Sequence, residues 1–156
     1  MGKINRRKNG FRHSPEEDVV AVTPTQASSD HLAKEKLALT QINQRKFKKA
    51  EIIYKELISE GTLNYVVFGN LAAIYGMQGR FDELIEVACK SLELNPEQPE
   101  AHYNIANALQ EKGELKASII HYNDALRLRP NYLEGYTHRG NAFKESGNLA
   151  VAIKSY

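Results

Sequence analysis

The chain of 156 residues repeats itself every 34 residues from His31 onward. Glycine recurs at Gly79, Gly113 and Gly147, and proline recurs at Pro96 and Pro130 with the same spacing. Other positions keep this register without an insertion; they are Phe47, Phe81, Leu115 and Leu149, then Ala38, Ala72, Ala106 and Gly140, and, at multiples of the period, Tyr54, Tyr122 and Tyr156. A period of this length restricts the chain to stacked units that each contact their neighbours.

Within each period the apolar residues follow a helical spacing. In the period from about 65 to 98, Phe68, Leu71, Ala72 and Tyr75 form one apolar face, and Leu84, Val87, Ala88 and Leu92 form a second. Gly79 separates the two faces and Pro96 follows the second, as expected at helix ends. The pattern predicts two helices joined by a short turn, and stacked hairpins of this kind form an all-α solenoid.

These motifs resemble the tetratricopeptide repeat family. The clearest repeat shows the family pattern at His102, Ile105, Ala106, Leu109, Gly113, Ser118, Tyr122, Ala125 and Pro130. The resemblance implies a right-handed superhelix of about three and a half repeats. We expect repeats at about 31–64, 65–98, 99–132 and 133–156, the last one incomplete. The first repeat departs from the family pattern, with Arg45 at the turn glycine and no closing proline.

Residues 1–30 have no helical or strand period. A basic cluster is followed by an acidic and Ser/Thr-rich stretch, and this composition predicts a disordered tail. The net charge of the whole chain is +2, which is too small to indicate a nucleic-acid or membrane partner. No apolar run is long enough for a secretory signal or a membrane span.

The sequence contains no pattern typical of an enzyme. Its five histidines lack the short spacing of a zinc site, and we find no phosphate-binding loop and no serine nucleophile motif. We therefore expect no catalytic residue, no cofactor and no metal. Cys89 is the single cysteine; we interpret it as a packed side chain, and its lack of a partner fits a cytoplasmic protein.

The family resemblance implies a protein-interaction module that holds a peptide or protein on its concave face, which the first helix of each repeat lines. The residues expected there are Asn70, Tyr103, Asn104, Asn107, His138 and Asn141. A side-chain amide both donates and accepts hydrogen bonds, so a row of them can hold an extended peptide backbone. Asparagine at these positions is also common in the family for helix packing, and both interpretations stay open.

Two alternatives remain. The repeats can recruit substrates for a larger glycosyl-, sulfo- or methyltransferase, or they can form a self-associating assembly factor. The second alternative depends on the incomplete last repeat, where Val151, Ile153 and Tyr156 form an apolar face without a following helix. Such an open end predicts either a fragment of a longer protein or an interface.

Overall fold

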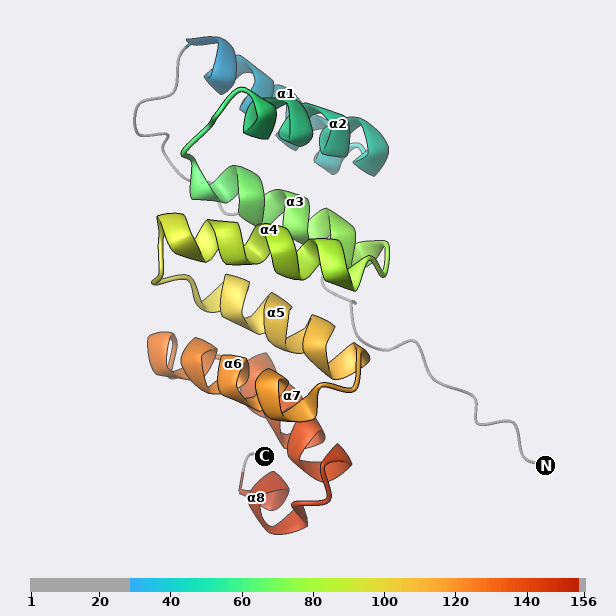
Figure 1. Cartoon of the computed structure of the whole chain (residues 1–156), viewed down its shortest axis with the longest axis vertical. Coiled ribbons are helices and arrows are strands. Elements are labelled where there is room, and N and C mark those ends of the chain that lie inside the picture. The colour runs from blue at the N-terminus through green and yellow to red at the C-terminus, as the bar shows by residue number, and fades with distance from the viewer. Residues whose placement is uncertain (1–28, 155–156) are drawn as a thin grey trace, which may run out of the picture.

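The computed structural model describes residues 29–154, and this range is built from helices joined by short turns (Figure 1). No strand occurs between residues 29 and 154. The all-α hairpin solenoid expected from the period is thus confirmed. Its eight helices are α1 (Ser29–Asn43), α2 (Phe47–Ser59), α3 (Tyr65–Met77), α4 (Phe81–Leu94), α5 (Pro99–Glu111), α6 (Leu115–Leu128), α7 (Leu133–Glu145) and α8 (Leu149–Ile153).

The helices stack in chain order along the long axis of the molecule (Figure 1). Each helix packs against the next one in the chain, and the first helices of neighbouring hairpins also meet, α3 with α5 and α5 with α7. Helix α5 is therefore covered from several sides. Its buried residues lie all around the helix; they are Ala101, Tyr103, Ile105, Ala106, Asn107, Ala108 and Leu109. This central position makes α5 the element that couples the two halves of the solenoid.

The predicted disordered tail lies almost entirely outside the described residues. Ser29 and Asp30, which we assigned to the tail, belong to the first turn of α1. Tyr156, which we assigned to the open end, also lies outside the described range.

Small side chains and buried serines hold the helices close together. Ala38, Ala72 and Ala106 are at most 1% exposed on the first helices. Ser91 and Ser118 are fully buried on the second helices, where the Ser91 hydroxyl donates to the Tyr65 carbonyl at 2.8 Å and the Ser118 hydroxyl donates to the Ala106 carbonyl at 2.8 Å. A buried hydroxyl needs such a partner, because an unpaired one costs about 1–3 kcal/mol.

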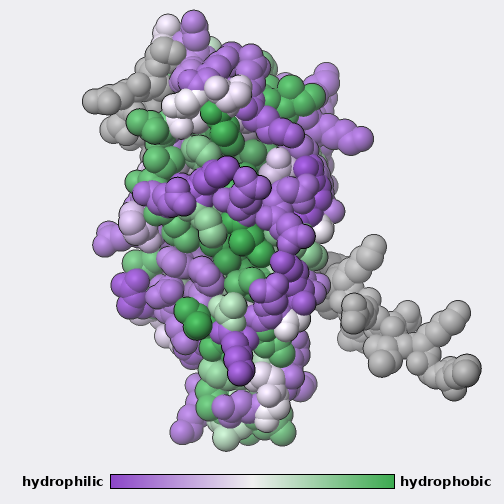
Figure 2. Space-filling model, in the orientation of Figure 1, coloured by the Kyte–Doolittle hydropathy of each residue, from purple (hydrophilic) through white to green (hydrophobic). Residues whose placement is uncertain are grey.

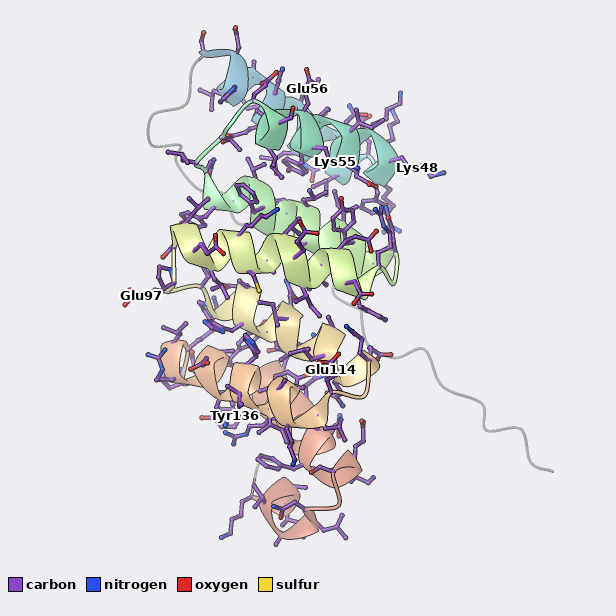
Figure 3. The ribbon with its side chains drawn as sticks, viewed as in Figure 1. Lys48, Lys55, Glu56, Glu97, Glu114 and Tyr136 are labelled. Atoms are coloured by element: carbon purple, nitrogen blue, oxygen red, sulfur yellow. The ribbon has the colours of Figure 1, made fainter. Side chains whose placement is uncertain are left out.

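The outer surface is hydrophilic. Figure 2 shows polar side chains over much of one face, with hydrophobic ones gathered in patches between them. On α2, Lys48, Lys55 and Glu56 are exposed (Figure 3). Ion pairs join neighbouring hairpins, for example Arg80 with Glu51 at 2.8 Å. Because exposed pairs are worth about 0–1 kcal/mol each, burial of the apolar faces must provide most of the stability.

The turn inside each hairpin uses the same backbone geometry. A hydrogen bond closes each turn, from the amide of Arg80 to the carbonyl of Tyr75 at 2.9 Å in the second hairpin, and at 2.8–2.9 Å in the other three. The residue before that amide has a positive φ: 73° at Gly79, 81° at Gly113 and 83° at Gly147. In the first hairpin this position is Arg45, with φ 57°. The atypical first repeat therefore keeps the same turn, although its arginine disfavours the left-handed backbone conformation that the turn requires.

A histidine pair lies between α5 and α6. The Nδ1 atoms of His102 and His121 are 3.1 Å apart, so one ring must donate while the other accepts. Burial lowers the pKa of both rings, and the charge of His102 lowers the pKa of His121 further. Asp124 raises the pKa of both, and Arg127 lowers that of His102. The pair therefore favours the neutral state.

We predict that Arg45→Gly stabilises the protein by about 0.5–1 kcal/mol. The left-handed conformation costs a non-glycine residue about 1–2 kcal/mol, and the greater freedom of glycine in the unfolded chain offsets part of the gain. Urea unfolding followed by circular dichroism measures the change. Gly113→Arg is the reciprocal control and should destabilise; equal or lower stability of Arg45→Gly would contradict this account of the turn.

We predict that stability falls as the pH drops below about 6.5, the usual histidine pKa in an unfolded chain. Because the pKa values of His102 and His121 are lowered in the folded state, the unfolded chain takes up these protons first, and the stabilisation present above that pH is lost. Urea midpoints between pH 7.5 and 5.5 test this. A His102→Gln/His121→Gln variant should show a shallower decline, and an identical slope would refute it.

Candidate functional site

The residues expected on the binding surface all lie on the first helices. Asn70 is on α3, Tyr103, Asn104 and Asn107 are on α5, and His138 and Asn141 are on α7. Since α5 packs against both α3 and α7, the structure places these helices side by side. The six side chains nevertheless differ in how much of each is free to meet a partner.

Two of the amides are engaged in the fold. Asn70 is 5% exposed, and its Nδ2 donates to the Tyr54 hydroxyl at 3.1 Å. Asn107 is 4% exposed, and its Oδ1 accepts from the Tyr122 hydroxyl at 2.5 Å. Burial raises the pKa of Tyr54 and of Tyr122, so both phenols stay protonated. These contacts support the packing interpretation for Asn70 and Asn107.

The remaining expected residues are more accessible. Asn104, His138 and Asn141 are half-buried. Tyr103, by contrast, is 3% exposed and belongs to a cluster of aromatic rings described below. Asn104 and Asn141 are therefore the two amides of the expected row that offer accessible surface.

Comparing the three junctions between successive hairpins explains these differences. We define each junction by four residues: one on the first helix of a hairpin, one on its second helix, the last residue of its 34-residue period, and one on the first helix of the next hairpin. The corresponding residue of the next junction lies 34 positions further along the chain. The first junction consists of Glu35, Tyr54, Asn64 and Asn70, the second of Gly69, Ala88, Gln98 and Asn104, and the third of Tyr103, Tyr122, Tyr132 and His138.

The first junction is filled by a buried tyrosine and polar contacts. Tyr54 is 1% exposed and bonds Asn70, while the Asn64 amide donates to the Glu35 carboxylate at 3.0 Å. Asn64 also caps α3 by accepting from the amide of Val66 at 3.1 Å. The phenol of Tyr54 thus fills the space between α2 and α3.

The third junction is filled by aromatic rings. The ring of Tyr103 lies 6.0 Å from that of Tyr122, 4.9 Å from that of Tyr132 and 5.5 Å from that of His138, between centroids. Tyr122 is fully buried, and its ring centroid is 6.3 Å from that of His138. Tilted and edge-on arrangements at these separations are favourable for aromatic pairs.

The second junction is hollow. Gly69 and Ala88 stand where the third junction has Tyr103 and Tyr122, and a cavity of about 130 Å³ lies between them. All four residues of this junction line it, together with Tyr65, Val66, Asn70, Ala72, Asn95, Glu97, Glu100 and Ala101. A Cβ added at Gly69 would meet one neighbour within 4 Å, the Ser91 Oγ at 3.9 Å. The cavity is partly open to solvent. One of its lining residues, Glu97, is exposed on the loop between α4 and α5 (Figure 3).

The polar groups around the cavity are unequally satisfied. The Gln98 amide donates to the Ser91 carbonyl at 2.8 Å and to the Asn95 carbonyl at 2.5 Å, and its Oε1 accepts from the Ser91 hydroxyl at 3.0 Å. Within residues 29–154, the side chain of Asn104 makes no hydrogen bond. Its counterpart Asn70 donates to the hydroxyl of Tyr54, and the residue that corresponds to Tyr54 here is Ala88. Asn104 is consequently an amide beside an unfilled space.

This cavity was not part of our sequence interpretation. We assigned Ala88 to the apolar face of its helix without comparing it with Tyr54 and Tyr122, which are 34 residues away on either side. That comparison would have identified a missing aromatic side chain. An alanine at a position where the neighbouring repeats have tyrosine was therefore the sequence feature that indicates the cavity.

Three further observations concern chemistry. Cys89 is exposed, so our interpretation of it as a packed side chain is wrong: it lies on the outer side of α4, next to buried Ala88. Among the residues described, no three His, Cys, Asp or Glu side chains gather as a metal site. None of helices α1 to α8 has the length and apolar character needed to span a bilayer.

At the end of the described chain, α8 exposes apolar side chains. Leu149 is 59% exposed and Ile153 is 74% exposed, whereas Val151 is half-buried. Of the residues expected at the open end, Ile153 is therefore exposed, and the interface there stays a prediction.

Solved structures with the same arrangement are helical repeat proteins. A crystal structure of MamA superposes with a TM-score of 0.78 at 19% identity, over 81% of this chain and 74% of that one. MamA 41-end from Desulfovibrio magneticus RS-1 gives 0.76 at 13% identity, over 81% and 71%. An O-GlcNAc transferase mutant from Thermobaculum terrenum gives 0.65 at 20% identity, over 75% of this chain and 23% of that one. At these identities the similarity establishes the fold.

The comparison with protein families agrees. Residues 106–147, which run from α5 to the turn before α8, match the model of the TPR repeat. A comparison with curated protein sequences finds no match. The family match over residues 106–147, the 34-residue period and the stacked hairpins together show a tetratricopeptide-like helical repeat fold.

Proposed function

We propose that this chain is a protein-interaction module that holds an extended segment of a partner protein on the surface formed by α3, α5 and α7. One observation carries the proposal: Asn104 presents an amide without a hydrogen-bond partner in the described chain, beside a cavity that opens to solvent. The side-chain amide of Asn104 can both donate a hydrogen bond to a peptide backbone and accept one from it. Asn141, which is half-buried on α7, supplies a second contact.

The proposal divides the amides of the first helices into two groups. Asn70 and Asn107 form hydrogen bonds with buried tyrosine hydroxyls and stabilise the fold. Asn104 and Asn141 contact the partner. The rings of Tyr103 and His138 are in edge-on contact with each other at the third junction. In this arrangement the contacts that fix the fold and the contacts that bind are made by different residues, so they can be tested separately.

The proposal assigns the repeats, at about 31–64, 65–98, 99–132 and 133–156, to binding and gives the preceding tail no role in it. It makes the module non-catalytic and without a cofactor, with a protein or peptide as partner and neither nucleic acid nor membrane as ligand. It places the chain in the cytoplasm, where a free exposed thiol such as Cys89 stays reduced.

A second candidate is substrate recruitment for a larger transferase. The observation in its favour is the fold similarity to the O-GlcNAc transferase mutant, of which this chain spans 23%. In such a protein the same surface would select the substrate. Finding a transferase domain encoded in the same reading frame would favour this candidate.

The third candidate is self-association through α8. Leu149 and Ile153 expose apolar surface there, and burying such surface between two copies is favourable by about 25 cal/mol per Å². Val151 lies between them and would join the contact.

We predict that Asn104→Ala/Asn141→Ala weakens peptide binding at least tenfold without changing helicity. Peptides are first selected from a random 12-residue display library against the full 156-residue chain. Fluorescence anisotropy then gives the Kd for each variant. Lys90→Ala, on the exposed side of α4, is the matched control. If Asn104→Ala/Asn141→Ala and Lys90→Ala bind the selected peptides equally well, the surface of the first helices is not the site.

For the third candidate, light-scattering mass across a concentration series is decisive. Self-association predicts a mass that rises with concentration and returns to that of a monomer in Val151→Ser/Ile153→Ser. Neither side chain belongs to the buried core, so circular dichroism should show unchanged helicity and serves as the control. A monomer at every concentration rules out this candidate.

A further inference from the structure

We infer that the cavity of the second junction is an anchor pocket for a tyrosine side chain of the partner protein. The inference deepens the proposed function and rests on it. Its basis is the register of the repeats: the chain itself places a tyrosine at this position in the first junction, Tyr54, and in the third, Tyr122. At the second junction it places Ala88, and the space that a phenol would fill is a cavity.

The size of the cavity suits one aromatic ring. Its volume is about 130 Å³. A cavity of about 150 Å³ in another protein binds benzene, so a single ring is the largest rigid group that fits. Two changes create the space: Ala88 leaves out the ring that Tyr54 and Tyr122 provide, and Gly69 leaves out the ring that Tyr103 provides.

The polar lining selects tyrosine over phenylalanine. In the first junction the Asn70 amide donates to the Tyr54 hydroxyl at 3.1 Å. Asn104 is the counterpart of Asn70, lines the cavity and lacks a hydrogen-bond partner within the described residues. Gln98 is already saturated by Ser91 and Asn95. A bound phenol would therefore complete at Asn104 the hydrogen bond that the first junction makes within the chain.

The charges at the rim select an unmodified tyrosine. Glu97 and Glu100 line the cavity, and the twelve lining residues include no lysine, arginine or histidine. Arg129, which is not among the lining residues, already pairs with Glu100. A phosphotyrosine would bring about two negative charges next to these carboxylates, without a cation to bind them. Phosphorylation of the partner's tyrosine should thus prevent its binding.

The first test uses p-cresol, the side chain of tyrosine, as the probe. In nuclear magnetic resonance titrations of the full ¹⁵N-labelled chain, p-cresol should cause saturable shifts at Gly69, Ala88 and the Asn104 side chain. Ala88→Tyr should abolish them, because the chain then fills its own cavity. Lys90→Tyr, which adds a tyrosine to the exposed side of the same helix, should leave them unchanged. Should Ala88→Tyr fold poorly, Ala88→Leu fills part of the same space and must also weaken binding.

A comparison with toluene tests the hydroxyl. Wild type should bind p-cresol at least fivefold more tightly than toluene, as one hydrogen bond of about 1 kcal/mol implies. Asn104→Leu should remove this preference while toluene still binds. Equal binding of the two probes to wild type, or saturable shifts that map away from the second junction, would overturn the inference.

Peptides separate this inference from the proposed function. Among the peptides selected above, replacing one tyrosine by alanine or phosphorylating it should cost at least tenfold in affinity, as should Ala88→Tyr in the protein. If binding depends on Asn104 and Asn141 but tolerates loss of every tyrosine, the peptide surface stands and the pocket is wrong. If p-cresol occupies the cavity while the peptides ignore Asn104 and Asn141, the pocket stands and the proposed function is wrong.

Discussion

The filling of the space between successive hairpins is the constraint on which this structure depends. A single hairpin cannot bury its apolar faces, so the next hairpin must cover them. Tyr54 seals the first junction and Tyr122 the third, and both are buried with a hydrogen bond to an asparagine on a first helix. At the second junction the small residues Gly69 and Ala88 leave this space unfilled, and the cavity lies there.

The same constraint separates structural from binding roles. Where a tyrosine is present, the nearby amides of Asn70 and Asn107 are occupied and belong to the core. Where it is absent, Asn104 keeps its amide beside an open space. A solenoid that is regular in its turns and small residues can thus acquire a specific pocket by shortening two side chains, at Gly69 and Ala88. The repeat fold positions the helices, and the residues that differ between repeats form the pocket.

Much of the fold was predictable because the 34-residue period directly encodes helix, turn and helix. The turn at Gly79 and the buried Ala72 followed from their register alone. The exposure of Cys89 did not, because it depends on which side of α4 the neighbouring hairpin covers. The hydrogen bond between Asn70 and Tyr54 likewise required the relative placement of α2 and α3. The cavity could have been predicted, since Ala88 interrupts a tyrosine position that the chain keeps elsewhere.

The most direct test of this account is the free energy of unfolding of Ala88→Tyr, measured by urea denaturation. In a filled core, adding a ring to a buried alanine overpacks the site and costs about 1–3 kcal/mol. Ala106→Tyr, at a position that is 0% exposed on α5 and does not line the cavity, should show that loss. If the second junction has the space of a missing tyrosine, Ala88→Tyr should instead raise the free energy of unfolding by about 1–2 kcal/mol. A destabilisation equal to that of Ala106→Tyr would contradict the account.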